Sequence, residues 1–306
     1  MHTIVMTGAT RGIGRVAVDR IISDDPEAHL VLLAREPGGS TLARRLASTG
    51  RQVTAINTDL LSMRSVRNAT ARLLEQFASG RLPPLRTLVG NAGLQFTNNT
   101  TATSDGLEAT FAINVLANHV LIRNLESAFR TPARIVITVS DTHFGDFSHN
   151  LGMVPAPRWQ DPGTIARIGA FPHPDTVAAG RAAYSTSKLA AIYSIHEFAR
   201  RLPEDITITG FNPGFVPGTD LARDAGRMAN FAMRRVLPLV AFTPLATSKS
   251  VAGQYLAQAA LGDTPATTGA YINRGRAERS SDESYEPVRE RQLWDTLEQL
   301  AHQHAR

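Results

Sequence analysis

The sequence of 306 residues contains no cysteine, and this absence removes several classes of chemistry at once. Without a thiol, the chain can form no disulfide framework, no thiolate metal site and no cysteine nucleophile. No apolar run approaches the ~18 residues that a membrane-spanning helix needs, so no membrane span is predicted. The first residues lead directly into a strand-like run, without the basic and apolar segments of a signal peptide. We therefore expect a soluble, cytoplasmic protein.

Lysine is nearly absent as well. Lys188 and Lys249 are the only lysines, so arginine supplies the rest of the 32 basic residues, and the formal net charge is +5. The arginines are dispersed along the chain, and no basic run is interleaved with aromatic side chains. This distribution is typical of a solvated surface, so we predict no nucleic-acid partner.

What the chain does contain is an alternation of strand-like and helix-like segments. The strand-like runs are Thr3–Thr7, His29–Ala34, Gln52–Asn57, Arg86–Asn91, Ala133–Val139, Ile206–Asn212 and Tyr271-Ile272. Helical patterns occupy Ile13–Ser23, Thr41–Ser48, Ser62–Ala78, Asp105–Phe129 and a segment from Tyr184 to about Leu202. This alternation predicts the α/β class, with a doubly wound, mainly parallel sheet of seven strands and helices on both faces. We expect residues 1–306 to form one Rossmann-fold domain.

Two segments interrupt the alternation. The first, at about residues 145–180, is rich in proline and glycine, and loops of this length inside a compact domain are usually functional. The second, at about residues 217–244, carries methionines and phenylalanines and is either a substrate lid or a pair of surface helices. Trp159 and Phe171 of the first segment could help to close a site. Together these side chains suggest a large, apolar substrate, since methionine-rich walls adapt to irregular shapes.

Tyr184 and Lys188 are four residues apart in a helical segment, so their side chains share one face. An ammonium group beside a phenol favours the phenolate and would lower the pKa of Tyr184 from its usual value near ~10. A lowered pKa would suit Tyr184 for proton transfer at neutral pH. The pair gains weight from a glycine-rich turn at the start of the chain.

That turn reads TGATRGIG and follows the first strand-like run directly. Gly8 allows a tight turn, Gly12 lets the backbone approach a pyrophosphate, and Gly14 allows close packing of the following helix. Thr10 and Ile13 lie in the same turn, whose helix N-terminus offers free N–H groups to an anion. The position between a strand and a helix is the one that a dinucleotide-binding motif requires.

The choice of dinucleotide depends on the end of the second strand. An acidic residue there would accept a hydrogen bond from the ribose 2′-hydroxyl of NAD. This chain has Arg35 instead, and Arg11 lies inside the glycine turn. Two guanidinium groups suit a 2′-phosphate, so the sequence predicts NADP(H). No metal site is predicted.

Further motifs make the chain resemble the short-chain dehydrogenase/reductase family over nearly its whole length. They are the glycine turn, Asp59-Leu60, Asn91-Ala92-Gly93, Asn114, Ser140, the Tyr184/Lys188 pair and Pro213-Gly214. The stretch Asn212 to Thr219 and the tail from Ser280-Ser281 to Leu293-Trp294 resemble the group of retinol dehydrogenases, protochlorophyllide reductases and WW-domain oxidoreductases. The resemblance implies that a cofactor contacts Gly8, Thr10, Arg11, Gly12, Ile13, Gly14, Arg35, Asp59, Leu60, Asn91, Ala92, Gly93, Tyr184, Lys188, Pro213, Gly214, Val216 and Thr219.

The resemblance also implies reduction of a ketone or aldehyde. Tyr184 would donate a proton, Lys188 would lower its pKa, Ser140 would polarise the carbonyl and Asn114 would anchor a proton relay. Candidate substrate contacts are Gln95, Phe96, His143 and Phe144, although His143 is also explained as a packing residue. The same residues would serve an NADP-dependent alcohol dehydrogenase or a C=C reductase. A dinucleotide-binding sensor without catalysis is a further alternative.

Three departures from the family pattern affect these expectations. Val139 stands where the family often has a second serine, and Gly218 stands where it commonly has a threonine. The contact to the nicotinamide carboxamide is therefore open between the Val216 backbone and Thr219. Ser140 and Tyr184 are also much farther apart in sequence than in most members. Because the added segment could cover the helices through which many members associate, we expect a monomer.

Overall fold

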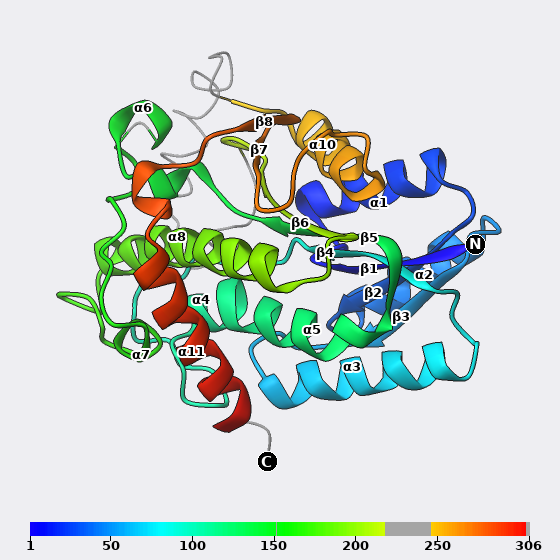
Figure 1. The fold of residues 1–306 in the computed structure, drawn as a ribbon, viewed down its shortest axis with the longest axis horizontal. Coiled ribbons are helices and arrows are strands. Elements are labelled where there is room, and N and C mark those ends of the chain that lie inside the picture. The colour runs from blue at the N-terminus through cyan, green and yellow to red at the C-terminus, as the bar shows by residue number, and fades with distance from the viewer. Residues whose placement is uncertain (151, 218–245, 304–306) are drawn as a thin grey trace.

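The computed structural model describes residues 1–150, 152–217 and 246–303. One sheet runs through the molecule in the strand order β3-β2-β1-β4-β5-β6-β7-β8 (Figure 1). Neighbouring strands from β3 to β7 pair in parallel, and β8 pairs antiparallel with β7. The bounds are β1 His2–Thr7, β2 Ala28–Ala34, β3 Val53–Asn57, β4 Leu85–Gly90, β5 Phe129–Thr138, β6 Ile206–Asn212, β7 Tyr271–Asn273 and β8 Arg276–Glu278. The predicted doubly wound α/β fold is confirmed.

The predicted number of seven strands was wrong, because β8 adds an eighth. Its three residues are all exposed and include no β-branched side chain, so neither alternation nor propensity marks it. A two-residue turn creates it: Arg274 and Gly275 have φ values of 48° and 90°. Two consecutive positive φ values are typical of the tight hairpin turns whose twist matches that of the flanking strands. The sequence therefore marks the turn that precedes β8, and not the strand itself.

Helices cover both faces of the sheet, and each strand alternates between them. Ile4 and Met6 of β1 pack into one apolar cluster, whereas Val5 packs into the other. On the first face lie α1 Gly12–Asp24, α2 Gly38–Ala47 and α10 Lys249–Leu261. On the second face lie α3 Met63–Ala78, α5 Ala117–Leu125, α8 Val177–Arg201 and α11 Pro287–Gln303. Burial on both faces explains why the strands read as nearly continuous apolar runs.

The long helix predicted for Asp105–Phe129 is shorter and interrupted. It begins with α4 Ala109–Phe111, continues as a π-helical turn at Ala112–Leu116 and then as α5, and ends in a 3-10 turn at Glu126–Ala128. Asp105 lies in a preceding turn, where its carboxylate accepts a hydrogen bond of 2.8 Å from the Met63 N–H. The π-helical turn is centred on Asn114, and such single turns occur frequently at functional sites.

The outer faces of α5 and α8 are covered by α11 (Figure 1). Glu298 of α11 lies 2.7 Å from the ring of His119, and Glu290 lies 2.8 Å from that of His196. Between them, Trp294 packs under the guanidinium of Arg201 at 4.3 Å. The sequence predicted that residues 145–180 would form this cover. From that segment, α7 Pro162–Ile165 packs against α11, and Trp159 packs against Tyr193 of α8, so the C-terminal helix and the inserted segment both contribute to the cover.

We accordingly propose that the protein is a monomer, because a second copy could reach α5 and α8 only by displacing α11. Light scattering coupled to size-exclusion chromatography is expected to give the mass of one chain, 33.1 kDa, at micromolar concentration. A dimeric or tetrameric mass that persists on dilution would contradict the proposal.

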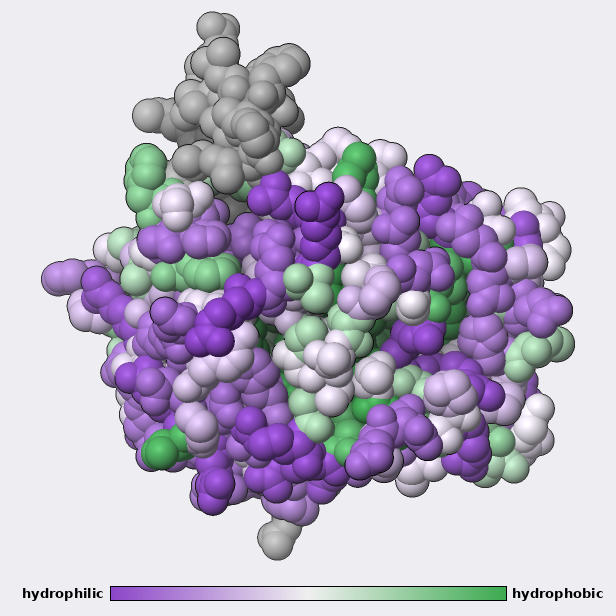
Figure 2. Space-filling view, turned by 45° about the horizontal axis from the view of Figure 1, so that its top comes forward, coloured by the Kyte–Doolittle hydropathy of each residue, from purple (hydrophilic) through white to green (hydrophobic). Residues whose placement is uncertain are grey.

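The visible surface matches the dispersed charge of the sequence. On the face in Figure 2, hydrophilic residues predominate, and the hydrophobic ones lie mainly in recesses between them. None of the helices in the described part of the chain is long and apolar enough to cross a bilayer.

Candidate active site

A cavity of about 700 Å³ opens at the carboxyl ends of the central strands. Gly8 follows β1 there, Asn91 follows β4, Ser140 follows β5 and Pro213 follows β6, and all four line the cavity. The strand order reverses at β1, since β2 and β4 lie on its two sides. The crevice outside this reversal point is where open α/β sheets bind their ligands.

The glycine turn leaves space for an anion at the N-terminus of α1. Gly8 and Gly12 have φ values of 67° and 58°. A Cβ on Gly8 would lie 2.7 Å from the Ala92 nitrogen, and one on Gly14 would collide with the Gly8 carbonyl. A Cβ on Gly12 would meet nothing within 4 Å. The turn therefore packs tightly behind Gly8 and Gly14 and stays open at Gly12, which fits a dinucleotide pyrophosphate at the helix N-terminus.

Hydrogen bonds from the end of β4 hold the turn in place. Asn91 donates from Nδ2 to the Gly8 carbonyl at 3.1 Å, and its Oδ1 accepts from the Thr138 hydroxyl at 3.2 Å. The Ala92 N–H donates to the hydroxyl of Thr7 at 3.0 Å. The ends of β1, β4 and β5 are thereby joined across the floor of the cavity.

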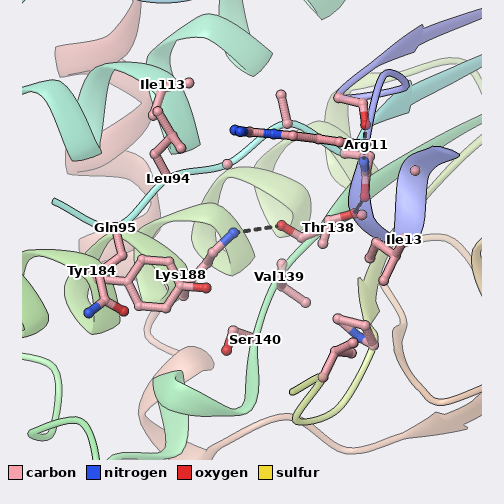
Figure 3. Close-up of a pocket in the computed structure, with 18 of the residues that line it drawn as sticks. Arg11, Ile13, Leu94, Gln95, Ile113, Thr138, Val139, Ser140, Tyr184 and Lys188 are labelled. Atoms are coloured by element: carbon pink, nitrogen blue, oxygen red, sulfur yellow. Dashed lines mark hydrogen bonds between the residues drawn. The ribbon is translucent and has the colours of Figure 1, made fainter. Parts of the chain in front are cut away.

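The residues predicted to select the cofactor lie together at one end of the cavity. Arg11 immediately precedes α1, Arg35 immediately follows β2, and both side chains are exposed at the lining. Asp59 and Leu60, which follow β3, line the same cavity, as do Thr10 and Ile13. Figure 3 shows Arg11 and Ile13 across the cavity from Tyr184.

Ser140, at the end of β5, and Tyr184 and Lys188, both on α8, converge in this cavity (Figure 3). The Ser140 side chain lies near that of Tyr184 and acts to lower the pKa of its phenol. The Nζ of Lys188 lies 5.5 Å from the Tyr184 ring centroid and donates to the Thr138 carbonyl at 2.9 Å. The Thr142 N–H donates to the Ser140 hydroxyl at 3.3 Å, which fixes that side chain at the end of β5.

Asn114 lies behind this group and is fully hydrogen-bonded. Its Oδ1 accepts from the Leu94 N–H, and its Nδ2 donates to the Leu94 carbonyl, both at 3.0 Å. Its Nδ2 also donates to the Ser187 hydroxyl at 2.9 Å. A Cβ on Gly93 would come within 3.1 Å of the Asn114 Oδ1 and 3.4 Å of the Lys188 Nζ, so a glycine there lets the loop pass between them.

Burial sets the protonation of the central pair. Burial raises the pKa of Tyr184 to about 12, although the side chain of Ser140 acts in the opposite direction. Burial also lowers the pKa of Lys188 to about 8. A lowered pKa of Tyr184 was expected from the sequence, whereas burial raises it here, because desolvation disfavours the phenolate. That Lys188 lowers the pKa of Tyr184 stays a prediction. At neutral pH Tyr184 keeps its proton, as a proton donor must.

Of the four predicted substrate contacts, only Gln95 lines the cavity. In Figure 3 it lies beside Tyr184. The other three, Phe96, His143 and Phe144, lie outside the lining. A Cβ on Gly180 of α8 would collide with the Phe96 carbonyl oxygen, so the backbone at Phe96 packs closely against this helix.

His143 is a packing residue and not an acid or base. It is fully buried, its Nδ1 donates to the Ser140 carbonyl at 2.6 Å, and its Nε2 accepts from the Ser281 N–H at 3.1 Å. Burial lowers the pKa of His143 to about 4, so the ring is neutral. Phe144 stacks on the ring of His149 at 3.7 Å.

The segment at residues 145–180 supplies side chains that the sequence did not single out. His149, Asn150, Met153 and Val154 line the cavity. The two aromatic residues predicted to close the site do not line it. Trp159 packs edge-on against Tyr193 at 4.7 Å, and Phe171 is buried in a small cluster on α8. From the sequence alone, either aromatic residue could face the site or the core. Packing against residues distant in sequence places both away from the cavity.

Two basic residues were also missed. Arg181, three residues before Tyr184, lines the cavity, and so does Lys249 at the start of α10. The chain has only two lysines, and both lie at this site. Because lysine is so rare in this sequence, Lys249 could have been recognised as a candidate site residue.

Pro213, Gly214 and Val216 line the cavity as predicted. Thr219 and the lid predicted at about residues 217–244 lie outside the described residues, apart from Pro217, which is part of the lining. Within the described ranges, no group of three or more histidine, aspartate or glutamate side chains could hold a metal ion.

Comparison with known proteins agrees with this geometry. A family model described as short chain dehydrogenase matches residues 2–150. A proposed daunorubicin C-13 ketoreductase from Streptomyces sp. (strain C5) is 33% identical over 223 residues, which span 70% of this chain and 66% of that protein. The chain belongs to the short-chain dehydrogenase/reductase family, a family of oxidoreductases. The resemblance drawn from the motifs is therefore confirmed.

Two further comparisons show how far the likeness extends. Protochlorophyllide reductase A, chloroplastic, from Oryza sativa subsp. japonica is 28% identical over 326 residues, covering 97% of this chain and 80% of that protein. The crystal structure of a blue fluorescent protein from a metagenomic library in complex with NADPH superposes with a TM-score of 0.62 at 24% identity. That match covers 89% of this chain and 95% of the other, and it supports the fold.

Proposed function

We propose that the protein is an NADPH-dependent reductase of ketones or aldehydes in bulky, largely apolar small molecules. The observation that carries the proposal is the convergence of Ser140, Tyr184 and Lys188 in the cavity that the glycine turn opens. The ketoreductase relative and the NADPH-bound neighbour support it. Leu94, Ile113, Met153 and Val154 give the cavity apolar walls.

The residues present fit a dinucleotide. The open space at Gly12 would take the pyrophosphate, and the Asn91-Ala92-Gly93 loop would border the cofactor. Arg11 and Arg35 would hold the 2′-phosphate. Lys249 adds a positive charge at the N-terminus of α10, whose Gly253 packs against Ile13 and Val16 of α1. When bound, the cofactor supplies the hydride for the carbonyl carbon.

Side chains of the protein stabilise the charge on the substrate oxygen and supply the proton. The Ser140 hydroxyl donates to the carbonyl oxygen, where negative charge grows. The Tyr184 hydroxyl, protonated at neutral pH, gives its proton to the same oxygen. Lys188 holds a positive charge behind the phenol, which limits the cost of the phenolate left after transfer. We propose that Asn114, through the Leu94 carbonyl and Ser187, positions the relay that returns a proton to this pair.

The test begins with binding of NADPH and NADH to the purified protein, followed by fluorescence titration. NADPH oxidation is then measured with a panel of bulky ketones, aldehydes and quinones. Tight NADPH binding with carbonyl turnover is the expected result. Tight binding without turnover of any carbonyl would contradict carbonyl reduction and favour C=C reduction, alcohol oxidation or a sensor.

Because Lys188 is buried, removal of its charge is expected to stabilise the folded protein. The native pKa of Lys188, about 8, lies below the ordinary value of 10.5, so protonation opposes folding. In wild type, stability should be lowest below pH 8 and should rise between pH 8 and 10.5, where only the unfolded chain keeps the proton. Lys188→Met should therefore increase the free energy of unfolding at pH 7 by about 2 kcal/mol and remove this rise.

Thermal unfolding at pH 7 and pH 9.5 would measure the effect. Lys249→Met is the matched control, because Lys249 is exposed and its removal should leave both values near those of wild type. A Lys188→Met variant that is less stable than wild type at pH 7 would refute the argument.

A further inference from the structure

Three side chains form a stripe along α8. Arg181, Tyr184 and Lys188 are spaced by three and four residues, so they share one face of the helix, and all three line the cavity. Lys188 reaches toward Thr138 on the cofactor side. Arg181 stands about 4.5 Å along the helix axis in the opposite direction from Tyr184. Along this face of the helix, Arg181 and Lys188 therefore lie on opposite sides of Tyr184.

Arg181 brings an uncompensated positive charge to its side of Tyr184. Its side chain is exposed, and no described residue forms a hydrogen bond or ion pair with its guanidinium. Asp141, one of the acidic lining residues, is engaged elsewhere, since its Oδ1 accepts from Asn212 and from Tyr271 at 2.6 Å each. His149 is paired with Asp146 at 2.7 Å. A guanidinium stays charged at any physiological pH and offers planar, paired donors.

Two further lining residues carry unsatisfied polar atoms. Asn150 is 6% exposed, and its Nδ2 has no hydrogen-bond partner among the described residues, while its Oδ1 accepts from the Gly152 N–H. Thr142 is 9% exposed, and its Oγ1 likewise lacks a partner there. Unsatisfied buried donors are costly, so such atoms at a cavity wall mark a place where a ligand can complete the bonding.

We propose that Arg181 binds an anionic oxygen group of the substrate, with Asn150 and Thr142 as supporting donors. The substrate is then a bulky ketone or quinone that carries a carboxylate at a distance from the reacting carbonyl. Apolar contacts with Met153 and Val154 hold its body, and the charge pair with Arg181 sets its orientation. This inference rests on the proposed carbonyl reduction and names the class of molecule reduced.

A matched pair of ketones tests the proposal. 4-Benzoylbenzoate and its methyl ester have the same aromatic ketone and differ in charge. Wild type with NADPH is expected to show a kcat/KM at least tenfold higher for the acid. Arg181→Gln should lower kcat/KM for the acid by about tenfold to a hundredfold, mainly through KM, and change the ester less than about threefold.

Two controls keep the outcomes distinct. Arg167→Gln removes an exposed arginine outside the cavity lining and should leave kcat/KM for both ketones unchanged. Calorimetric titration of both compounds into Tyr184→Phe with bound NADPH measures binding without turnover, so the subsite is tested even if neither ketone is reduced. Equal affinity for acid and ester, or an equal loss for both in Arg181→Gln, would overturn the proposal. So would an Arg167→Gln effect as large as that of Arg181→Gln.

Discussion

Tyr184→Phe is expected to lower kcat for carbonyl reduction by at least about a thousandfold and to leave the Kd for NADPH within about threefold of wild type. The phenol hydroxyl is the proposed source of the proton, and phenylalanine keeps the ring while removing that proton. The dinucleotide would be held mainly by the glycine turn and the arginines, at the other end of the cavity. Stopped-flow measurement of NADPH oxidation and fluorescence titration of binding give the two values.

Tyr193→Phe is the matched control for this variant. Tyr193 lies on the same helix and is fully buried, but its hydroxyl donates to the Glu283 carbonyl at 2.7 Å, and it does not line the cavity. Loss of this hydroxyl should lower the free energy of unfolding by about 1 kcal/mol and leave turnover unchanged. If Tyr184→Phe kept wild-type turnover, Tyr184 would not be the proton donor. A protein with no turnover to lose would fit the sensor alternative instead.

The second large effect concerns the choice of cofactor. The double variant Arg11→Gln, Arg35→Gln is expected to raise the Kd for NADPH by about a hundredfold or more, since charged hydrogen bonds contribute about 1.5–3 kcal/mol each. The Kd for NADH should change less than about threefold, because NADH lacks the 2′-phosphate. The two guanidinium groups lie at the same end of the cavity, so they can act on one phosphate. Parallel titrations with both dinucleotides measure the change in preference.

Arg20→Gln provides the control for charge alone. Arg20 is exposed on α1 and does not line the cavity, so its removal should leave both dissociation constants unchanged. An equal loss of NADPH and NADH affinity in the double variant would show that Arg11 and Arg35 do not recognise the 2′-phosphate. Wild type that binds both dinucleotides equally would overturn the assignment of NADP(H) and leave the fold as it is.

Local signals explain why so much of the site could be predicted. The glycine turn, the pair Tyr184 and Lys188, and Ser140 at the end of β5 each depend on a short stretch of chain. A glycine needed for positive φ or close packing, or two side chains on one helical face, leaves a fixed spacing in the sequence. The sheet was likewise predictable because strands buried on both faces are long apolar runs.

The errors arose where contacts distant in sequence decide the outcome. His143 follows the catalytic serine closely, yet bonds to the Ser140 carbonyl and the Ser281 N–H bury it as a neutral ring. The pKa of Tyr184 depends on how completely α8 is buried, which no spacing reveals. Part of the cover over α8 comes from α11, far along the chain, beside the inserted segment, whose Trp159 packs against Tyr193.

The sequence by itself determined the α/β class and the dinucleotide-binding turn. It also identified Ser140 and Tyr184 as residues that meet in the site. These features follow from backbone conformation and helical spacing, which are local. The tertiary structure alone decided which side chains line the substrate end of the cavity. Arg181, Asn150 and Met153 line it, whereas Trp159 and Phe171 do not. The physical reason is that burial, desolvation and the pairing of polar groups depend on neighbours that only the folded chain brings together.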